Sequence, residues 1–404
     1  MKKRLVVEKV VSSGSCSGCG LCASVVAPSK IRMVPSASLQ WRPAVVQPLS
    51  ADELQRFYAT CPGVSLVHDV PTQPEQVDPI WGSVLGCYTG YAADPVVRRQ
   101  GSSGGVITAL AQFLLRTGQV DGVSQNAASS SNPTGNEVQF SRGRNDVLRA
   151  AGSRYGPASA LSRVEEMLSG GQTFAFVGKP CEVAALRALG RIDARVGRQV
   201  PFLLSFMCAG TPSGLGTQAL LAAMGVVPEQ VASFRYRGDG WPGKARAVTH
   251  AGEAFEMDYN KSWGTILNRH LQFRCKICPD GTGEFADVVC ADAWYGKDGY
   301  PDFTERDGRS LILVRTPRGA QLLADAVAAG DVCTEVLDLG EVAAMQPYQV
   351  ERKRMVLGRL LAARAAQGHA PVTRGLRLVA AARQASIGEF LRSAAGTFRR
   401  AKGE

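Results

Sequence analysis

Short apolar runs alternate with helical patterns in the middle of the chain. The run Thr173-Phe174-Ala175-Phe176-Val177-Gly178 predicts a buried strand, and a helical pattern follows it at 182–189. A second unit has a predicted strand at 201–207 and a predicted helix at about 213–224. Because repeated strand–turn–helix units place their strands side by side in one direction, this order favours an α/β fold with parallel strands.

The regions around these units predict further elements. The stretch Gly101-Ser102-Ser103-Gly104-Gly105 opens an amphipathic helix that runs to about Arg116 and stops at Gly118. Residues 126–136, which are rich in Ser, Asn and Gly, predict a loop. A strand at 310–315 and a helix at 318–329 follow, and the last residues, rich in Ala and Arg, predict mostly helix.

The amino-terminal region has a different character. It lacks helical periodicity and is rich in Pro, Ser and Gly. One helix is predicted at 50–58, where Ser50 and Glu53 form a capping box. Pro71, Pro74 and Pro79 then predict a linker.

The composition is that of an ordinary globular protein, with 45% hydrophobic and 20% charged residues among 404. The net charge of +11 is compatible with an acidic partner, a phosphorylated cofactor or an anionic surface, and it selects none of them. Glu8 and Lys9 interrupt the apolar run of the amino terminus, so no secretory signal is predicted, and no apolar window is long enough to span a membrane. Eleven cysteines in such a chain indicate metal or redox chemistry rather than disulfides. We therefore expect a cytoplasmic protein, with no nucleic-acid partner.

Three cysteines are grouped near the amino terminus with the spacing Cys-x2-Cys-x2-Cys. This spacing opens the bacterial ferredoxin pattern, which ends in a Cys followed by Pro. The next cysteine along the chain is followed by Pro62, so we predict that one 4Fe–4S cluster is held by Cys16, Cys19, Cys22 and Cys61. The neighbouring glycines suit a backbone that wraps tightly around a cluster. A four-cysteine zinc site is the alternative.

Four other cysteines form a dispersed set. Cys181 and Cys208 each follow a predicted strand, at the end where an open α/β sheet binds its ligands, and Cys275 and Cys278 form a CxxC pair. From spacing alone, a joint four-ligand site is no better supported than its alternatives, which are ordinary buried thiols, a redox CxxC or half of a zinc site. We interpret Cys87, Cys290 and Cys333 as packing residues.

Glycine-rich turns give weaker signals. The stretch at 101–105 would suit a phosphate at a helix amino terminus, with Arg98 and Arg99 nearby, or it is a plain capped helix start. The G-x-G-x-x-A match at 214–219 is better explained by helix packing than by dinucleotide binding, because Thr211 and Pro212 resemble a cap and a first helical residue before it. The stretch at 235–243 either binds a flavin or a phosphorylated substrate, or it forms a solvated hairpin.

The four scattered histidines do not support hydrolytic chemistry.

Eight motifs, taken in order, resemble the coenzyme F420 hydrogenase/dehydrogenase beta-subunit family. This iron–sulfur flavoprotein family also includes divinyl chlorophyllide and 7-hydroxymethyl chlorophyll reductases. The motifs are CxxCxxC…CP, SSGGVITAL, GSRYGPAS, GKPCEVAALR, FMCAGTPS, FRYRGDGWPG, CKIC and ADVVCADAW, between Cys16 and Trp294. Two positions depart from the family pattern, which has a small hydroxyl residue in place of Lys179 and an aliphatic residue in place of Cys290.

The resemblance implies FAD and two 4Fe–4S clusters, the second of them on Cys181, Cys208, Cys275 and Cys278. It implies flavin contacts by Ser103, Gly104, Gly105, Arg154 and Tyr155. Lys179, Arg235 and Arg237 are further candidates for binding the cofactor or substrate anions. The expected activity is electron transfer between a ferredoxin or another redox subunit, the clusters, FAD and a small organic two-electron substrate such as a deazaflavin.

The resemblance also suggests the layout of the chain. We expect a small ferredoxin-like 4Fe–4S module at 1–76, a mixed α/β flavoprotein domain in two parts at 80–165 and 166–340, and a helical basic tail at 341–404. The alternative function is a non-catalytic electron-transfer or scaffold subunit of a larger redox or polysaccharide-biosynthesis complex. In that case the basic, amphipathic tail from Arg352 to Lys402 would contact a partner or an anionic membrane surface. A solvated helix that packs on the main body is the favoured alternative for this tail.

Overall fold

The fold is centred on one mixed sheet of eight strands. A computed structural model describes residues 6–69, 77–297 and 300–403, so Pro71 and Pro74 of the predicted linker lie outside the described residues. The strand order is β18-β6-β17-β14-β10-β9-β7-β8. These strands are β6 (Gly86–Ala92), β7 (Gly122–Ala128), β8 (Asn136–Ser141), β9 (Phe174–Gly178), β10 (Phe202–Phe206), β14 (Val288–Asp292), β17 (Ser310–Val314) and β18 (Val332–Val336).

The middle of the sheet is parallel and its edges are antiparallel. Strands β14, β10, β9 and β7 run in one direction, and β17, β6, β18 and β8 add antiparallel neighbours. The predicted α/β class with parallel strands is therefore confirmed for the central units. The carboxyl ends of the four parallel strands meet at one edge of the sheet, which is where the polypeptide leaves β9 toward Cys181 and β10 toward Cys208.

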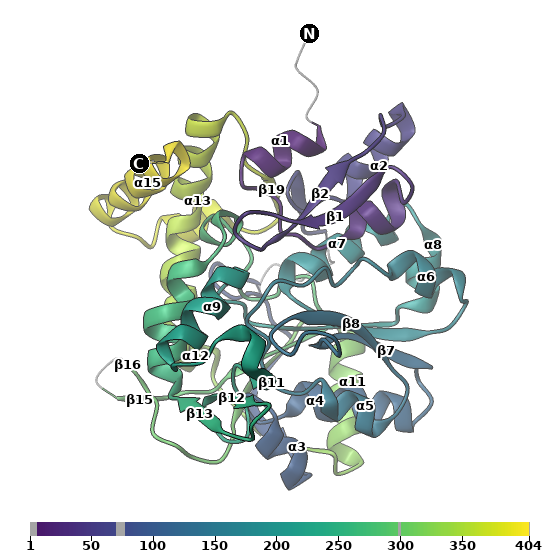
Figure 1. The fold of residues 1–404 in the computed structure, drawn as a ribbon, viewed down its shortest axis with the longest axis vertical. Coiled ribbons are helices and arrows are strands. Elements are labelled where there is room, and N and C mark those ends of the chain that lie inside the picture. Colours follow the sequence, from purple (N-terminus) through teal and green to yellow (C-terminus); the bar gives the residue numbers. More distant parts are fainter. Residues whose placement is uncertain (1–5, 70–76, 298–299, 404) are drawn as a thin grey trace.

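Alternating side chains on the strands form two hydrophobic layers. Phe174, Phe176 and Leu203 belong to one buried cluster, whereas Ala175 and Leu204 belong to the other. This alternation follows from the two-residue period of a strand whose faces are both covered by helices. Figure 1 shows helices on both faces of the sheet. They include α3 (Pro95–Gln100), α4 (Val106–Arg116), α5 (Arg144–Arg149) and α11 (Pro317–Ala328) on one side, and α6 (Val164–Ser169), α7 (Pro180–Gly190) and α8 (Ala194–Gln199) on the other.

The amino-terminal and carboxy-terminal segments contact each other beside this sheet. The amino-terminal elements are α1 (Val7–Ser12), η1 (Cys22–Val26), the hairpin β1 (Ile31–Pro35) and β2 (Trp41–Val45), α2 (Ala51–Thr60) and β3 (Ser65–Val67). The carboxy-terminal elements are α13 (Pro347–Gln367), β19 (Val372–Arg374), α14 (Leu378–Ala382) and α15 (Ile387–Lys402). Strand β19 pairs in parallel with β3, so the helical tail lies next to the amino-terminal module in the upper part of Figure 1.

A small antiparallel sheet covers the remaining side. It contains β11 (Val231–Arg235), β12 (Ala245–Thr249) and β13 (Ala254–Met257), and it packs on α9 (Gly214–Ala223). The short elements that complete the main connections are β4 (Val77–Asp78), β5 (Gly82–Ser83), η3 (Pro228–Gln230), η4 (Asn260–Ile266), η5 (Leu267–His270), α10 (Phe273–Lys276), β15 (Tyr295–Lys297), β16 (Tyr300–Asp302), η6 (Leu339–Glu341) and α12 (Val342–Met345).

Several local predictions are confirmed. The capping box of Ser50 and Glu53 is present at the start of α2, and the predicted helix from the glycine-rich stretch to Arg116 is α4. The glycines of the G-x-G-x-x-A match lie inside α9, where a Cβ on Gly216 would contact His270 at 2.8 Å, so this helix is closely packed as predicted.

Three local predictions are wrong. The cap of α9 is Ser213 rather than Thr211, because the Ser213 hydroxyl accepts a hydrogen bond from the N–H of Gly216 at 3.3 Å. The loop predicted at 126–136 is shorter, since β7 continues to Ala128 and β8 begins at Asn136. The amino-terminal region also contains α1 and the π-helical turn η1, which its composition did not predict.

Candidate functional site

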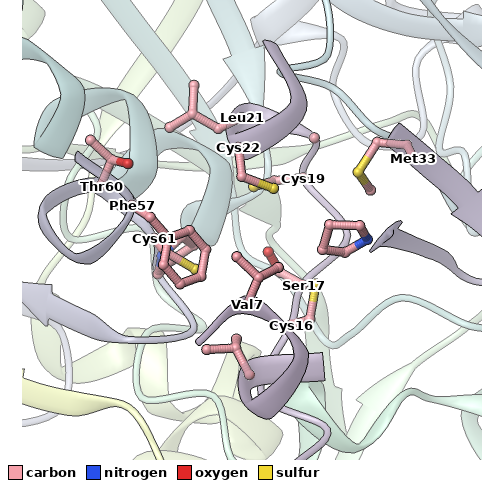
Figure 2. A pocket seen from close by; sticks show the side chains of 14 residues that line it. Val7, Cys16, Ser17, Cys19, Leu21, Cys22, Met33, Phe57, Thr60 and Cys61 are labelled. Atoms are coloured by element: carbon pink, nitrogen blue, oxygen red, sulfur yellow. The ribbon is translucent and has the colours of Figure 1, made fainter. Parts of the chain in front are cut away.

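The four predicted amino-terminal ligands surround one small cavity. Cys16, Cys19, Cys22 and Cys61, the first thiol set, all line it together with the apolar side chains of Val7 and Phe57. Figure 2 shows these side chains around the cavity. Cys16 and Cys19 lie on the loop after α1, Cys22 begins η1, and Cys61 caps the end of α2. The fold therefore brings together all four residues that the spacing selected.

Three glycines allow the loop of the first thiol set to adopt its conformation. Gly14, Gly18 and Gly20 have φ values of +63°, +77° and +86°, which other residues rarely adopt. A Cβ on Gly18 would lie 2.7 Å from the carbonyl oxygen of Trp41. The loop is thus able to turn between successive cysteines while it lies against the β1–β2 hairpin.

The electrostatics of the first thiol set disfavour free thiolates. Burial raises the pKa of Cys19 to about 11, and it also raises the pKa values of Cys16, Cys22 and Cys61. The thiolates raise one another's pKa further, because they are like charges in a buried space. Bound metal cations would supply the missing positive charge, since the thiolate is the form that ligates metal.

The first thiol set offers four sulfur donors around one cavity. Four cysteines are the donor set of a 4Fe–4S cluster and also of a structural zinc ion. The residues that line this cavity therefore fit either group.

The dispersed cysteines also come together. Cys181, Cys208, Cys275 and Cys278, the second thiol set, lie on the first turn of α7, on the segment after β10, and on and after α10. The charge of Cys278 raises the pKa of both Cys181 and Cys208, after the larger effect of burial, so these thiols are neighbours. The charge of Cys275 acts on Cys208 in the same way, and burial with these neighbours raises the pKa of Cys208 to about 12. The four thiols therefore form one partly buried group.

Backbone hydrogen bonds hold the segments of the second thiol set together. The N–H of Cys208 donates to the carbonyl of Gly281 at 2.9 Å, and the N–H of Thr211 donates to the sulfur of Cys275 at 3.3 Å. N–H donors directed at cysteine sulfur are typical of cluster sites, where they tune the reduction potential.

A buried cation from α13 supports the second thiol set. The guanidinium of Arg352 donates to the carbonyls of Cys208 and Cys275, both at 2.7 Å, and the residue is 4% exposed. The sequence pattern did not predict this role: it placed Arg352 in a helical tail that either packs on the main body or contacts a partner. The buried side chain of Arg352 agrees with the first of these alternatives. A basic residue in a basic helix gave no signal that could have distinguished it from its exposed neighbours.

A large cavity lies at the carboxyl edge of the parallel strands. Its volume is about 740 Å³, which is within the usual range for cofactor sites, and we call it the central cavity. Cys208 of the second thiol set is part of its wall, as are Lys179 and Cys290. Cys290, which the sequence pattern indicated as a packing residue, is buried and also faces this space.

One end of the central cavity is formed by the start of α4. Residues Gly105 to Thr108 line it, and the helical N–H groups of a first turn have no partner within the helix. Gly105 has a φ of +75°, and a Cβ there would lie 2.6 Å from the carbonyl oxygen of Val97. This arrangement leaves backbone N–H groups and the positive end of the helix dipole for an anion such as a phosphate.

Aromatic rings form another wall. Tyr155 and Trp263 lie with their ring centroids 4.6 Å apart, and Trp294 lies 5.0 Å from Phe303. Two buried amide oxygens of the cavity wall, Asn126 Oδ1 and Asn268 Oδ1, have no hydrogen-bond partner. Apolar planes together with unpaired polar atoms fit a large heterocycle that carries hydrogen-bonding groups, which is the chemistry of a flavin.

Six of the predicted cofactor residues line the central cavity, and two do not. Those that line it are Ser103, Gly105, Arg154, Tyr155, Lys179 and Arg237. Gly104 lies outside the wall, where its N–H donates to the Ser310 hydroxyl at 2.9 Å, and Arg235 pairs with Asp239 at 3.0 Å. The sequence pattern located the cavity but could not separate residues that face it from their neighbours.

Most polar members of this group already have partners within the chain. Arg237 binds both carboxylate oxygens of Asp292, at 2.8 and 2.7 Å. Arg154 donates to Asn136 Oδ1 at 2.7 Å and to the carbonyl of Gly135 at 2.8 Å. These two arginines therefore hold the wall in place, whatever else they contact.

Comparison with known proteins gives two matches to one family, described as coenzyme F420 hydrogenase/dehydrogenase, beta subunit. The amino-terminal part of that family matches residues 87–165, and its carboxy-terminal part matches residues 171–339. Neither range includes the first thiol set or α13.

Two curated relatives illustrate the similarity. The chain is 25% identical over 334 residues to coenzyme F420-dependent sulfite reductase of Methanocaldococcus jannaschii, a match that covers 78% of this chain and 46% of that protein. It is 24% identical over 263 residues to the beta subunit of coenzyme F420 hydrogenase of Methanosarcina barkeri, covering 63% and 82%. The chain thus spans less than half the length of the sulfite reductase.

A solved structure shares the fold. A chain of the F420-reducing NiFe hydrogenase complex from Methanosarcina barkeri matches with a TM-score of 0.52 and 22% sequence identity, covering 69% of this chain and 94% of that one. At this identity the similarity concerns the fold alone.

Proposed function

Because the chain belongs to the coenzyme F420 hydrogenase/dehydrogenase beta-subunit family, we propose that it is an iron–sulfur flavoprotein oxidoreductase. Each thiol set holds one 4Fe–4S cluster, and the central cavity holds FAD. The protein transfers electrons between a ferredoxin-like or subunit partner and a small organic two-electron substrate, for which the deazaflavin coenzyme F420 is the first candidate.

One observation carries this proposal. Cys208 belongs to the second thiol set and also lines the central cavity. A ligand in that cavity would therefore adjoin the thiol group, with no intervening layer of protein. When bound, the clusters supply one-electron transfer and FAD supplies two-electron storage with hydride exchange. The chain contributes by placing their sites next to each other.

The residues of the chain have distinct tasks in this proposal. The N–H groups at the start of α4 bind the cofactor phosphates, and the aromatic wall orients the flavin ring. Lys179 faces the cavity with its cation held by Glu182. Burial lowers the Lys179 pKa, but the negative charges of Glu182, Cys181 and Cys208 together raise it more, so the net shift is upward. Lys179 therefore stays protonated, and it attracts an anionic substrate or cofactor group without giving up its proton.

A second candidate function is an electron-transfer or scaffold subunit without its own substrate. The exposed surface of α15 favours it, because Ile387 and Leu391 are 79% and 59% exposed on a helix that also carries Arg392. Such a mixture of apolar and basic side chains fits a protein partner or an anionic surface. Among the described residues, no helix combines the length and the apolarity needed to cross a bilayer.

The test is anaerobic purification followed by cofactor analysis and turnover. We expect about eight iron atoms and one FAD per chain. Supplied with a small chemical reductant, the protein should then reduce coenzyme F420 in steady turnover, measured as the loss of F420 absorbance. Full cofactor content without turnover of any deazaflavin would favour the scaffold function, whereas stoichiometric zinc without colour would exclude both.

A further inference from the structure

One short segment connects the two thiol sets. Gln272 Nε2 donates to the carbonyl of Ser17 at 3.4 Å, and the ring of Phe273 lies against Gly14, where a Cβ would come within 2.9 Å of it. Arg274 Nη2 donates to the carbonyl of Pro62 at 3.2 Å. The next residue is Cys275. Residues 272–274 thus contact the loop of the first set immediately before the chain supplies a thiol to the second.

Arg274 is an unusual cation in this segment. Its residue is 2% exposed, and both Nε and Nη1 lack a hydrogen-bond partner. Within the described part of the chain it forms no ion pair, and its side chain donates to one carbonyl. The buried Arg315 and Arg352 also lack a carboxylate in that part, but each donates to two or more carbonyls. A guanidinium remains charged in proteins, and burying an unpaired charge is costly, so this arrangement calls for negative charge nearby.

Arg274 adjoins both thiol sets. Its Nη2 binds the carbonyl of Pro62, which follows Cys61 of the first set, and its backbone precedes Cys275 of the second set. Two other cations each contact one set. Arg42, which donates to Gln272 Oε1 at 3.0 Å, lies beside Gly18 of the first set, and Arg352 donates to the carbonyls of Cys208 and Cys275 of the second.

We propose that Arg274 is a positioning residue shared by both cluster sites, where its fixed charge and free N–H groups stabilise the added electron at either cluster. This inference rests on the proposed presence of both clusters. Reduction by one electron adds one negative charge to the cluster that receives it and requires no proton. A buried cation next to both sites therefore raises both reduction potentials.

The test is a redox titration of the anaerobic protein, followed by electron paramagnetic resonance of each cluster. Arg274→Met should shift both midpoint potentials to more negative values. We expect about a tenfold change in the ratio of reduced to oxidised cluster, equivalent to about 59 mV for a one-electron couple. Arg274→Lys, which keeps the charge, should keep both midpoint potentials close to those of the wild-type protein.

Two matched variants serve as controls, because each removes a cation that contacts one thiol set. Arg42→Met should move only the midpoint of the first cluster, and Arg352→Gln only that of the second. If Arg274→Met folds but loses iron, loss from both sets supports the shared role and loss from one set contradicts it. A fully loaded Arg274→Met with one or both midpoints unmoved overturns the inference while leaving the proposed function intact. A wild-type protein that lacks a cluster overturns both.

Discussion

Three of the four thiols of the first set come from one stretch of seven residues, whereas those of the second set come from three separate places in the chain. The first set depends on a glycine-rich loop and on the end of α2. The second depends on the sheet, because β9 and β10 must lie side by side before Cys181 and Cys208 can approach each other.

The two sets also differ in their surroundings. The first set, at residues 16–61, lies outside both family matches. The second set borders the central cavity through Cys208. We therefore propose that the first set exchanges electrons with a partner and the second with the substrate, and variants of each set can test this division.

The largest effect is expected from removing one thiol of each set. Cys208→Ser should lower the iron content from about eight to about four atoms per chain and abolish F420 turnover, because it removes the cluster next to the cavity. Cys61→Ser should lose the same amount of iron yet retain F420 turnover with a small chemical reductant. Iron analysis and the loss of F420 absorbance measure both quantities. Equal loss of F420 turnover in the two variants would contradict the division.

A large loss of stability is expected when the buried carboxylate of Glu182, which acts on both thiol sets, loses its cation. Glu182 is fully buried, pairs with Lys179, and raises the pKa values of both Cys19 and Cys181. Lys179→Ser, which restores the small hydroxyl of the family pattern, leaves that carboxylate without its cation. We expect a loss of about 3–5 kcal/mol, measured by anaerobic denaturation.

The control for this prediction removes both charges. Lys179→Ser combined with Glu182→Gln should recover most of the lost stability, because breaking a buried pair costs more than deleting it. If the double variant is as unstable as the single one, the loss comes from packing at the start of α7 rather than from the orphaned carboxylate.

The features that could be predicted from the sequence are those set by residues close together in the chain. The first thiol set could be identified because Cys16, Cys19 and Cys22 lie close together and Pro62 follows Cys61. The central strands and helices were identified because their apolar runs are short, buried and bounded by turns. The approach of Cys275 and Cys278 to the ends of β9 and β10 could be expected only from the family resemblance.

What the sequence did not predict depends on long-range contacts. The end of β7 resembles a loop because its side chains are polar, yet Ser124 is fully buried, and Gln125 and Asn126 line the central cavity. A strand that forms the wall of a polar site loses the apolar pattern by which strands are recognised. The roles of Arg274 and Arg352 were missed for a related reason. The sequence does not show whether an arginine side chain is buried or exposed, because that depends on the fold.

The smallest expected effect concerns the loop of the first set. Gly18→Ala forces alanine into a left-handed conformation and brings its Cβ to 2.7 Å from the carbonyl oxygen of Trp41. The conformation alone costs about 1–2 kcal/mol, and the contact adds to it. We therefore expect a modest loss of stability together with lower iron occupancy in the first set and an unchanged second set, measured by denaturation and electron paramagnetic resonance.

Gly118→Ala separates the two causes. Gly118 has a φ of +69°, close to that of Gly18, but a Cβ there would meet no atom within 4 Å. This variant should therefore lose about 1 kcal/mol through conformation alone and keep full iron in both sets. If Gly18→Ala also keeps full iron, the first cluster tolerates movement of its loop, and its local construction is less demanding than the close approach of Gly18 to Trp41 indicates. If Gly18→Ala instead empties the second set, the two sites are coupled through the segment at 272–275 more strongly than their separate construction implies.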